Sequence, residues 1–218
     1  MIKSLYISRS EEDVPLLLNF CSEQGIELES KSMISFVGLD FIVEESFDVV
    51  FFSSPRSVQY FLEKYNLSDQ IFMGCIGHST AEELAKWGFD SSFIGENSGH
   101  PEQVAEAFKN WLGKRKVLFP ISMSSNKTFT SQIPFEQKLE ITVYQTIYTP
   151  QIIEEANLYV FTSPSNLKAF LSVNEVPKAP VIAWGNTTAK AISNAGMKLI
   201  HVLESATEEE LVSFLANG

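Results

Sequence analysis

The feature that most constrains the fold of this chain is an internal repeat. Residues 52–58 read FSSPRSV, and residues 161–167 read FTSPSNL. Further along, GHSTA at residues 77–81 returns as GNTTA at residues 185–189, after almost the same spacing. Two motifs in one order at one spacing indicate a duplicated structural unit of roughly one hundred residues, which is an ordinary domain size.

Each unit alternates short apolar runs with segments of helical period, which is typical of a sheet covered by helices. Right-handed crossovers make such a sheet parallel. The sequence therefore predicts an α/β fold of two similar lobes, each a five-stranded parallel sheet with flanking helices. The expected strands lie near residues 47–53, 71–77, 92–95, 116–120 and 139–148 in one lobe, and near 157–162, 180–185, 198–203, 2–8 and 26–36 in the other.

Since two strands of the second set come from the N-terminus, that lobe is expected to be discontinuous. We expect it to contain residues 1–34 plus 151–218, with residues 37–148 inserted as the other lobe. A two-stranded connection would then join the lobes and leave a cleft between them.

Two serine-proline pairs mark helix starts. Ser54-Pro55 and Ser163-Pro164 each follow an apolar run, so the serine suits the N-cap and the proline the first helical position. In a parallel α/β fold such strand-to-helix turns lie at the carboxyl edge of the sheet, where ligands bind.

Other helix ends are expected nearby. Ser79 to Glu82 forms the pattern of a capping box, and Thr187 occupies the same place as an N-cap in the other lobe. Ser10 with Asp13 predicts a further helix start, and Gly25 is expected to close that helix.

Charge and composition exclude several classes of function. The formal net charge is −11, and the basic residues are scattered, with Lys114-Arg115-Lys116 as the only cluster, which disfavours nucleic-acid binding. No apolar run approaches the length of a membrane span, so we expect a cytoplasmic protein without membrane contact, and by default a monomer. Cys21 and Cys75 are widely separated and the histidines are isolated, so we expect buried free thiols and no metal.

No nucleophile or nucleotide motif is present. The sequence holds no Gly-x-Ser-x-Gly elbow, Walker loop or Gly-x-Gly-x-x-Gly fingerprint. What remains are helix N-termini, whose free N–H groups and positive dipole ends bind carboxylate or phosphate without any lysine. A ligand with many anionic groups would profit most, so a polycarboxylate is the expected small-molecule partner.

These motifs resemble the uroporphyrinogen-III synthase family. The resemblance rests on the F-[ST]-S-P and G-x-x-T-A turns in both lobes and on the strand ITVYQT at residues 141–146, and it covers nearly the whole chain. It implies a cofactor-free reaction on hydroxymethylbilane, a linear tetrapyrrole with eight carboxylates. The terminal hydroxyl leaves as water, the last ring inverts through a spiro intermediate, and the macrocycle closes as uroporphyrinogen III. Spontaneous closure gives isomer I.

The resemblance also assigns roles to residues. Tyr144 would hydrogen-bond the departing hydroxyl or orient the terminal ring, acting as a weak general acid, or else be a packing residue of a linker strand. Arg9 and Arg56 would pair with substrate carboxylates, or else be exposed helix-start residues. The remaining predicted substrate-binding residues are polar groups of the repeated turns: Thr80, Thr188, Ser53, Ser54, Thr162, Ser163, Ser79 and Thr187.

The chain departs from the family pattern after the strand near residues 116–120. Ile121 stands where the family often has an arginine, and Pro134 interrupts the helix expected there. An alternative interpretation is a non-catalytic two-lobed binding or sensor protein for a tetrapyrrole or another polycarboxylate. A nucleotide-handling α/β enzyme is disfavoured by the missing phosphate loops.

Overall fold

A computed structural model describes residues 2–68, 70–96, 101–125 and 127–217. The chain divides into two compact units. Unit 1 comprises residues 1–35 and 147–218, and unit 2 comprises residues 36–146. The chain passes between them within strand β3 (Ile34–Gly38) and within strand β8 (Lys138–Tyr148).

Unit 1 contains a five-stranded sheet in the order β11-β10-β9-β1-β2, and every neighbouring pair is parallel, as expected. Its strands are β1 (Ser4–Ile7), β2 (Glu27–Ser30), β9 (Leu158–Phe161), β10 (Val181–Ala183) and β11 (Leu199–Val202). Its helices are α1 (Pro15–Gln24), α5 (Pro164–Leu171), α6 (Asn186–Asn194) and α7 (Glu208–Asn217).

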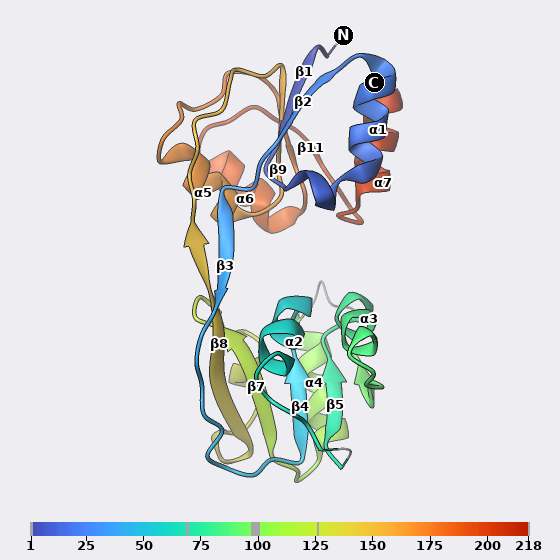
Figure 1. Ribbon diagram of the computed structural model, residues 1–218, viewed down its shortest axis with the longest axis vertical. Coiled ribbons are helices and arrows are strands. Elements are labelled where there is room, and N and C mark those ends of the chain that lie inside the picture. Colours follow the sequence, from blue (N-terminus) through green and yellow to red (C-terminus); the bar gives the residue numbers. More distant parts are fainter. Residues whose placement is uncertain (1, 69, 97–100, 126, 218) are drawn as a thin grey trace. The chain divides into compact units, whose positions relative to one another are not determined.

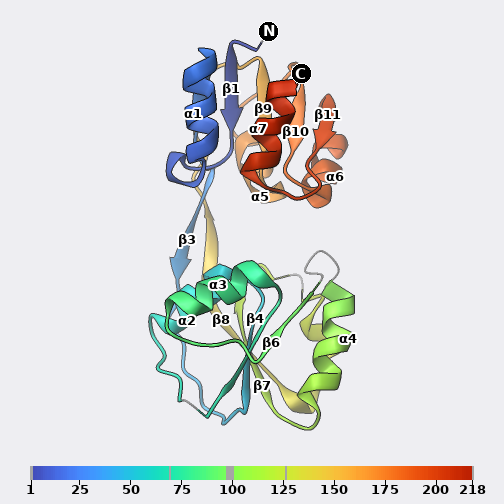
Figure 2. The same ribbon diagram turned by 90° about the vertical axis from the view of Figure 1, so that its right-hand side faces the viewer.

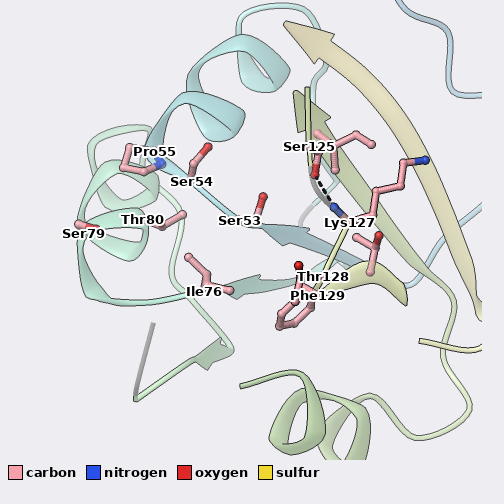
Figure 3. Close-up of a pocket in the computed structure, with 12 residues that line it drawn as sticks. Ser53, Ser54, Pro55, Ile76, Ser79, Thr80, Ser125, Lys127, Thr128 and Phe129 are labelled. Carbon is pink, nitrogen blue, oxygen red and sulfur yellow. Dashed lines mark hydrogen bonds between the residues drawn. The ribbon is translucent and has the colours of Figure 1, made fainter. Parts of the chain in front are cut away.

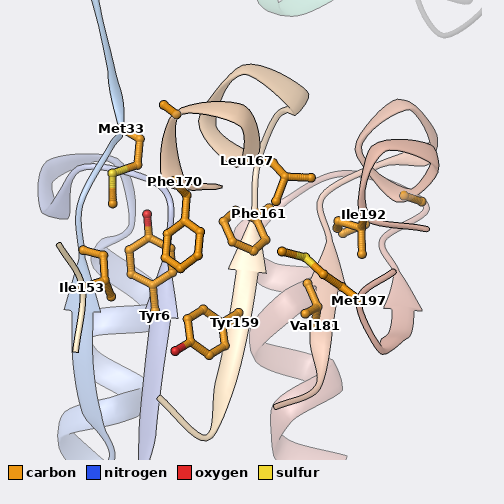
Figure 4. Close-up of a cluster of buried hydrophobic side chains, with 13 residues drawn as sticks. Tyr6, Met33, Ile153, Tyr159, Phe161, Leu167, Phe170, Val181, Ile192 and Met197 are labelled. Carbon is orange, nitrogen blue, oxygen red and sulfur yellow. The ribbon is translucent and has the colours of Figure 1, made fainter. Parts of the chain in front are cut away.

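The helices of unit 1 cover both faces of this sheet (Figures 1 and 2). α1 and α7 pack on one face, where Leu5 and Ile7 of β1 meet Leu17 and Leu211. α5 and α6 pack on the other face, around the aromatic cluster of Figure 4, which includes Tyr6. Because successive side chains of a strand point to opposite faces, β1 needs an unbroken apolar run to fill both layers.

Unit 2 contains a six-stranded sheet in the order β3-β8-β7-β4-β5-β6. The pairs from β8 to β6 are parallel. In addition to β3 and β8 it has β4 (Val49–Phe52), β5 (Phe72–Cys75), β6 (Phe93–Ile94) and β7 (Val117–Ser122), and the helices α2 (Pro55–Leu62), α3 (His78–Lys86) and α4 (Pro101–Leu112). Short 3₁₀ turns follow β7 at Thr130–Gln132 and Phe135–Gln137.

Alternation along β4 divides the core of unit 2 into two layers. Val50 and Phe52 pack with residues of α2 and α3, whereas Val49 and Phe51 pack with residues of α4 and with Phe129. Since β4 is buried on both faces, its carboxyl end is held rigidly, which fixes the position of the turn that follows it.

The prediction of a single strand over residues 26–36 is wrong. The chain leaves β2 after Ser30 and starts β3 at Ile34, so the sheet of unit 2 has six strands instead of five. One cause of the break is local, because the Ser32 hydroxyl accepts a hydrogen bond from the N–H of Ile34 (3.3 Å) and donates one to the carbonyl of Ile34 (2.8 Å). Side-chain bonds of this kind compete with strand pairing.

The predicted helix start at Ser10 is also wrong. Residues Glu11–Asp13 form one 3₁₀ turn, the Ser10 side chain makes no capping bond, and α1 begins at Pro15. Proline suits this first position because it has no N–H to leave unpaired. The other end is confirmed: Gly25 closes α1 at a φ of +65°, where glycine meets no steric penalty.

Both cysteines are buried free thiols, as predicted. Burial raises the pKa of Cys21 and that of Cys75 to about 11. In the described part of the chain, no helix is long and apolar enough to cross a membrane.

Candidate active site

The carboxyl edge of the unit 2 sheet forms a pocket of about 400 Å³. Its walls are the turn from β4 to α2, the turn from β5 to α3, and the loop between β7 and β8 (Figure 3). The lining residues are Ser53, Ser54, Pro55, Ile76, Ser79, Thr80, Ile121, Ser125, Lys127, Thr128, Phe129 and Thr130. Seven of these twelve carry a hydroxyl group, so the pocket is rich in neutral hydrogen-bonding groups.

Ser54 starts α2 as predicted. Its hydroxyl accepts a hydrogen bond from the N–H of Ser57 at 3.1 Å, and the Ser57 hydroxyl accepts one from the N–H of Ser54 at 3.2 Å. This reciprocal pair is a capping box, and Pro55 occupies the first turn. Ser53, one residue earlier, is exposed at the pocket.

The caps predicted at Ser79 and Thr187 are wrong. Gly77 is the N-cap of α3 and Gly185 is the N-cap of α6, and neither helix has a side-chain capping bond. Both helices therefore begin earlier than expected, because a glycine in an extended conformation serves as the half-helical residue. Ser79 and Thr187 consequently lie inside the first turn, among the backbone N–H groups that a helix start leaves unpaired.

Thr80 occupies the next position of α3 and lines the pocket. Its side chain is fully buried, and its Oγ1 has no hydrogen-bond partner within the described part of the chain. Such groups are rare, because a buried hydroxyl without a partner loses the hydrogen bonds that water would supply. Thr80 thus brings a buried hydroxyl, without a partner among the described residues, to the wall of the pocket.

Tyr144 of β8 contacts this site through Ser54. The two hydroxyl oxygens lie 3.4 Å apart. The Tyr144 ring is stacked on Tyr60 with centroids 5.3 Å apart, and the edge contact with Phe36 has a centroid distance of 6.1 Å. A register shift in the β7–β8 pairing at Ser122 sets this part of β8, and such irregularities re-aim side chains near functional sites.

The two predicted arginines have similar surroundings in their own units. The guanidinium carbon of Arg56 lies 3.7 Å from the ring centroid of Phe36, and that of Arg9 lies 4.5 Å from the ring centroid of Trp184. Neither arginine forms an ion pair with another described residue. Stacking on an aromatic face orients a guanidinium and leaves its edge for a carboxylate.

The corresponding edge of unit 1 is held together more tightly. Ser163 caps α5 as predicted, accepting a hydrogen bond from the N–H of Asn166 at 3.1 Å. The Thr162 hydroxyl donates to the carbonyl of Ser8 at 2.8 Å, and the Thr162 N–H donates to the Ser8 hydroxyl at 2.9 Å. Thr188, the counterpart of Thr80, is also buried.

Asn166 is a residue that the sequence did not single out. Its side-chain oxygen accepts the N–H of Met33 at 2.7 Å, and its amide group contacts the hydroxyls of Thr162 and Ser163 at 3.4 and 3.2 Å. This side chain therefore links the start of α5 to the segment that enters β3. The repeat places Ser57 at the same position in unit 2. The change from serine to asparagine between the two copies was the sequence signal that could have pointed to Asn166.

The sequence-based prediction also left out the loop after β7, which forms part of the site. Ile121 is buried and lines the pocket, where the family pattern suggested an arginine. The available signal was the run of serines and threonines over residues 122–131. Among the described residues, no group of three or more His, Cys, Asp and Glu side chains could hold a metal ion.

Comparison with known proteins identifies the family. A family model described as uroporphyrinogen-III synthase HemD matches residues 18–213. The chain belongs to the uroporphyrinogen-III synthase family. No curated protein sequence matches the chain significantly.

Solved structures of the uroporphyrinogen-III synthase family have the same fold. The uroporphyrinogen-III synthetase of Helicobacter pylori has a TM-score of 0.69 at 18% identity, covering 100% of this chain and 99% of that chain. A mutant uroporphyrinogen III synthase of the extremely thermophilic bacterium Thermus thermophilus has a TM-score of 0.64 at 14% identity, covering 98% of each chain. At such low identity the likeness concerns the fold, and the α/β architecture is therefore that of the family.

Proposed function

We propose that this chain is a uroporphyrinogen-III synthase, a cofactor-independent lyase of tetrapyrrole and haem biosynthesis. It closes hydroxymethylbilane to uroporphyrinogen III with inversion of the last pyrrole ring and loss of water. Membership of the family supports this activity. The expected partner is thus a small polycarboxylate, and we retain the predictions of a cytoplasmic monomer.

The observation that carries the proposal is the hydroxyl of Thr80. It is buried beside the unit 2 pocket and has no hydrogen-bond partner among the described residues. It lies in the first turn of α3, where helix N–H groups are free. A substrate carboxylate in the pocket would accept hydrogen bonds from this hydroxyl and from those amides, and the helix dipole would favour its charge. Ser53, Ser54 and Ser79 would add hydroxyls around the same group.

The reaction depends mainly on how the substrate is oriented. The bond between the terminal carbon and its hydroxyl breaks, and the hydroxyl leaves as water after taking a proton. The last ring attacks the terminal carbon through its substituted α-carbon to give the spiro intermediate. The bond from that α-carbon to its old methylene bridge then breaks, and the unsubstituted α-carbon of the same ring bonds to the methylene, which inverts the ring. Holding the reacting ends in place is worth up to about 7–11 kcal/mol in favourable cases. Tyr144 would donate the proton, and the proton that the last ring loses from its unsubstituted α-carbon at closure would restore its phenol.

Unit 1 supplies the second set of predicted contacts. Thr187, Thr188 and the start of α5 beside Ser163 would bind further carboxylates, and Arg9 would pair with one, as Arg56 of unit 2 would with another. Thr162 remains a predicted contact, although its hydroxyl already donates to Ser8. The cleft in which one substrate meets both units stays a prediction.

The function is tested by supplying freshly generated hydroxymethylbilane and separating the products by isomer. The proposal expects isomer III, formed faster than spontaneous closure. A non-catalytic polycarboxylate-binding protein would give isomer I at the spontaneous rate while still binding the tetrapyrrole. That result would refute the enzyme and favour the alternative.

Replacement of Tyr144 by Phe tests the proton donor. The variant keeps the ring packed on Tyr60 and loses the hydroxyl near Ser54. We expect kcat to fall at least about a hundredfold, the usual lower range for a general acid, with KM almost unchanged. Tyr65→Phe, elsewhere in unit 2, is the matched control. Unchanged turnover of Tyr144→Phe would make this tyrosine a packing residue.

A further inference from the structure

The loop between β7 and β8 is a wall of the pocket that none of the repeated motifs accounts for. Its described residues are 123–125 and 127–137. Five of them line the pocket, namely Ser125, Lys127, Thr128, Phe129 and Thr130. Their position opposite Ser79 and Thr80 in Figure 3 makes the loop the second side of any ligand held there.

Strand β8 and the core fix both ends of this loop. The N–H of Met123 donates to the carbonyl of Tyr144 at 2.9 Å. The ammonium of Lys138 donates to the carbonyl of Thr130 at 2.8 Å. Phe129 is buried and stacked on Phe51, with ring centroids 4.3 Å apart. The middle of the loop lies between these attachments.

An ion pair ties the middle of the loop to β8. The ammonium of Lys127 lies 2.7 Å from a carboxylate oxygen of Glu140, whose side chain is only 19% exposed. Figure 3 shows the Lys127 side chain extending toward β8 and away from Thr80. Lys127 has a φ of +57°, a conformation uncommon for residues other than glycine, so the surroundings must hold it there.

The protonation of Glu140 agrees with a persistent pair. Burial on β8 favours the neutral carboxyl, but the hydrogen bond and charge of Lys127, together with Thr130 and Lys138, outweigh burial and lower the pKa of Glu140 below its usual value. Partly buried pairs are less screened by salt than exposed ones. Glu140 therefore stays ionised near neutral pH.

The backbone of Lys127 also forms a hydrogen bond that orients the Ser125 side chain. The N–H of Lys127 donates to the Ser125 hydroxyl oxygen at 3.4 Å, so the hydrogen of that hydroxyl is still able to donate to a ligand. The dashed line in Figure 3 marks this contact. Ser125 and Thr80, whose hydroxyl has no partner in the described part of the chain, thus lie on two walls of one pocket.

We infer that the Lys127–Glu140 ion pair is a positioning device that holds the β7–β8 loop as a carboxylate-binding wall, with Ser125 donating to the same substrate carboxylate as Thr80. This inference rests on the proposed function for the identity of the ligand. The lysine acts through the loop and does not touch the substrate. Breaking the pair therefore weakens substrate binding and leaves the chemical step intact.

The test uses three variants of the full chain. Lys127→Met and Glu140→Gln remove the pair, and Lys127→Arg keeps it. Lys116→Met removes the exposed Lys116–Glu45 pair (3.3 Å) at the other end of β7 and is the matched control. The measurements are kcat and KM for isomer III formation, the Kd of uroporphyrin III as a non-reacting macrocycle with the same eight carboxylates, and amide hydrogen exchange of residues 122–131.

We expect the first two variants to raise KM and Kd about fivefold, the size of an ordinary ion-pair effect, with kcat within about twofold. Their loop amides should exchange faster, while Lys127→Arg and Lys116→Met should resemble the wild type. Faster loop exchange with unchanged KM and Kd would overturn the inference, as would unchanged exchange. If the wild type forms only isomer I, the proposed function fails, but the Kd series still decides the role of the pair.

Discussion

The two units carry the same motifs at the carboxyl edges of their sheets and use the polar groups differently. In unit 1 the Thr162 hydroxyl donates to Ser8 and the Asn166 side chain binds Met33 and both neighbouring hydroxyls. In unit 2 Ser53 is exposed and the Thr80 hydroxyl has no partner among the described residues. One edge is tied to its own unit, and the other opens on a pocket.

The difference shows that a repeated motif fixes position more than role. Both copies place a serine cap and a proline at a helix start, because those residues specify the local backbone. What the hydroxyls and amides then contact depends on which strands lie nearby. In unit 1 Ser8, the residue after the neighbouring strand β1, contacts Thr162. In unit 2 the contact to Ser54 comes from Tyr144 of β8, which lies beyond the neighbouring strand β7.

The largest effect on stability is expected for Asn166→Ala. This change leaves the N–H of Met33 buried without its partner, which costs about 1–3 kcal/mol. Ser57→Ala, at the equivalent place in unit 2, removes a hydroxyl whose two bonds both go to the backbone of Ser54, and it should cost about 1 kcal/mol. Urea unfolding of the two variants, with each unfolding transition analysed separately, compares their losses of stability. Equal losses of unfolding free energy would show that the two units do not differ at this position.

A smaller effect is expected for the two caps themselves. Ser54→Ala and Ser163→Ala should each lower the free energy of unfolding by about 1 kcal/mol. Because only Ser54 contacts the Tyr144 hydroxyl, only Ser54→Ala should also lower kcat for isomer III formation. A drop in kcat for both variants would mean that the two caps serve the reaction alike.

The smallest effect concerns the thiols, one in each unit. Burial raises the pKa of Cys21 and of Cys75 from 9.0 to about 11, so each thiol stays neutral in the folded state while its unfolded counterpart ionises. Their contribution to stability is full below about pH 9 and is lost as the pH rises toward about 11. At about pH 8, below both values, a thiol reagent should label native Cys21 and Cys75 slowly. Fast labelling of one cysteine would show that its unit opens first.

Local sequence accounts for much of the fold and for part of the site. Period and apolar content predicted the parallel sheet of unit 1, and serine-proline pairs predicted the starts of α2 and α5. The predictions of N-caps at Ser79 and Thr187 failed because a glycine earlier in each turn is the N-cap. That choice depends on backbone conformation, which residue preferences describe only weakly.

Contacts between distant residues explain the remaining misses. The break between β2 and β3 adjoins Met33, whose N–H binds Asn166 far along the chain. The Lys127–Glu140 pair depends on the register between β7 and β8, including its shift at Ser122. The Met33–Asn166 bond and the Lys127–Glu140 pair are not visible in one segment of sequence, because each requires the folded sheet to bring its partners together.

The central claim is that unit 2 keeps a buried hydroxyl unpaired for a substrate, and Thr80→Val tests it most directly. Valine matches threonine in shape and removes an oxygen without a partner among the described residues, so the free energy of unfolding should be unchanged or rise by about 1 kcal/mol. In the same variant kcat/KM for isomer III should fall about tenfold or more, the worth of a hydrogen bond to a charged group.

Thr162→Val is the control for stability, because it removes a hydroxyl that donates to Ser8. It should destabilise unit 1 by about 1–3 kcal/mol. We expect Thr80→Val to lose activity without losing stability. A Thr80→Val protein that is destabilised and still forms isomer III at the wild-type rate would show that this hydroxyl is not reserved for a substrate.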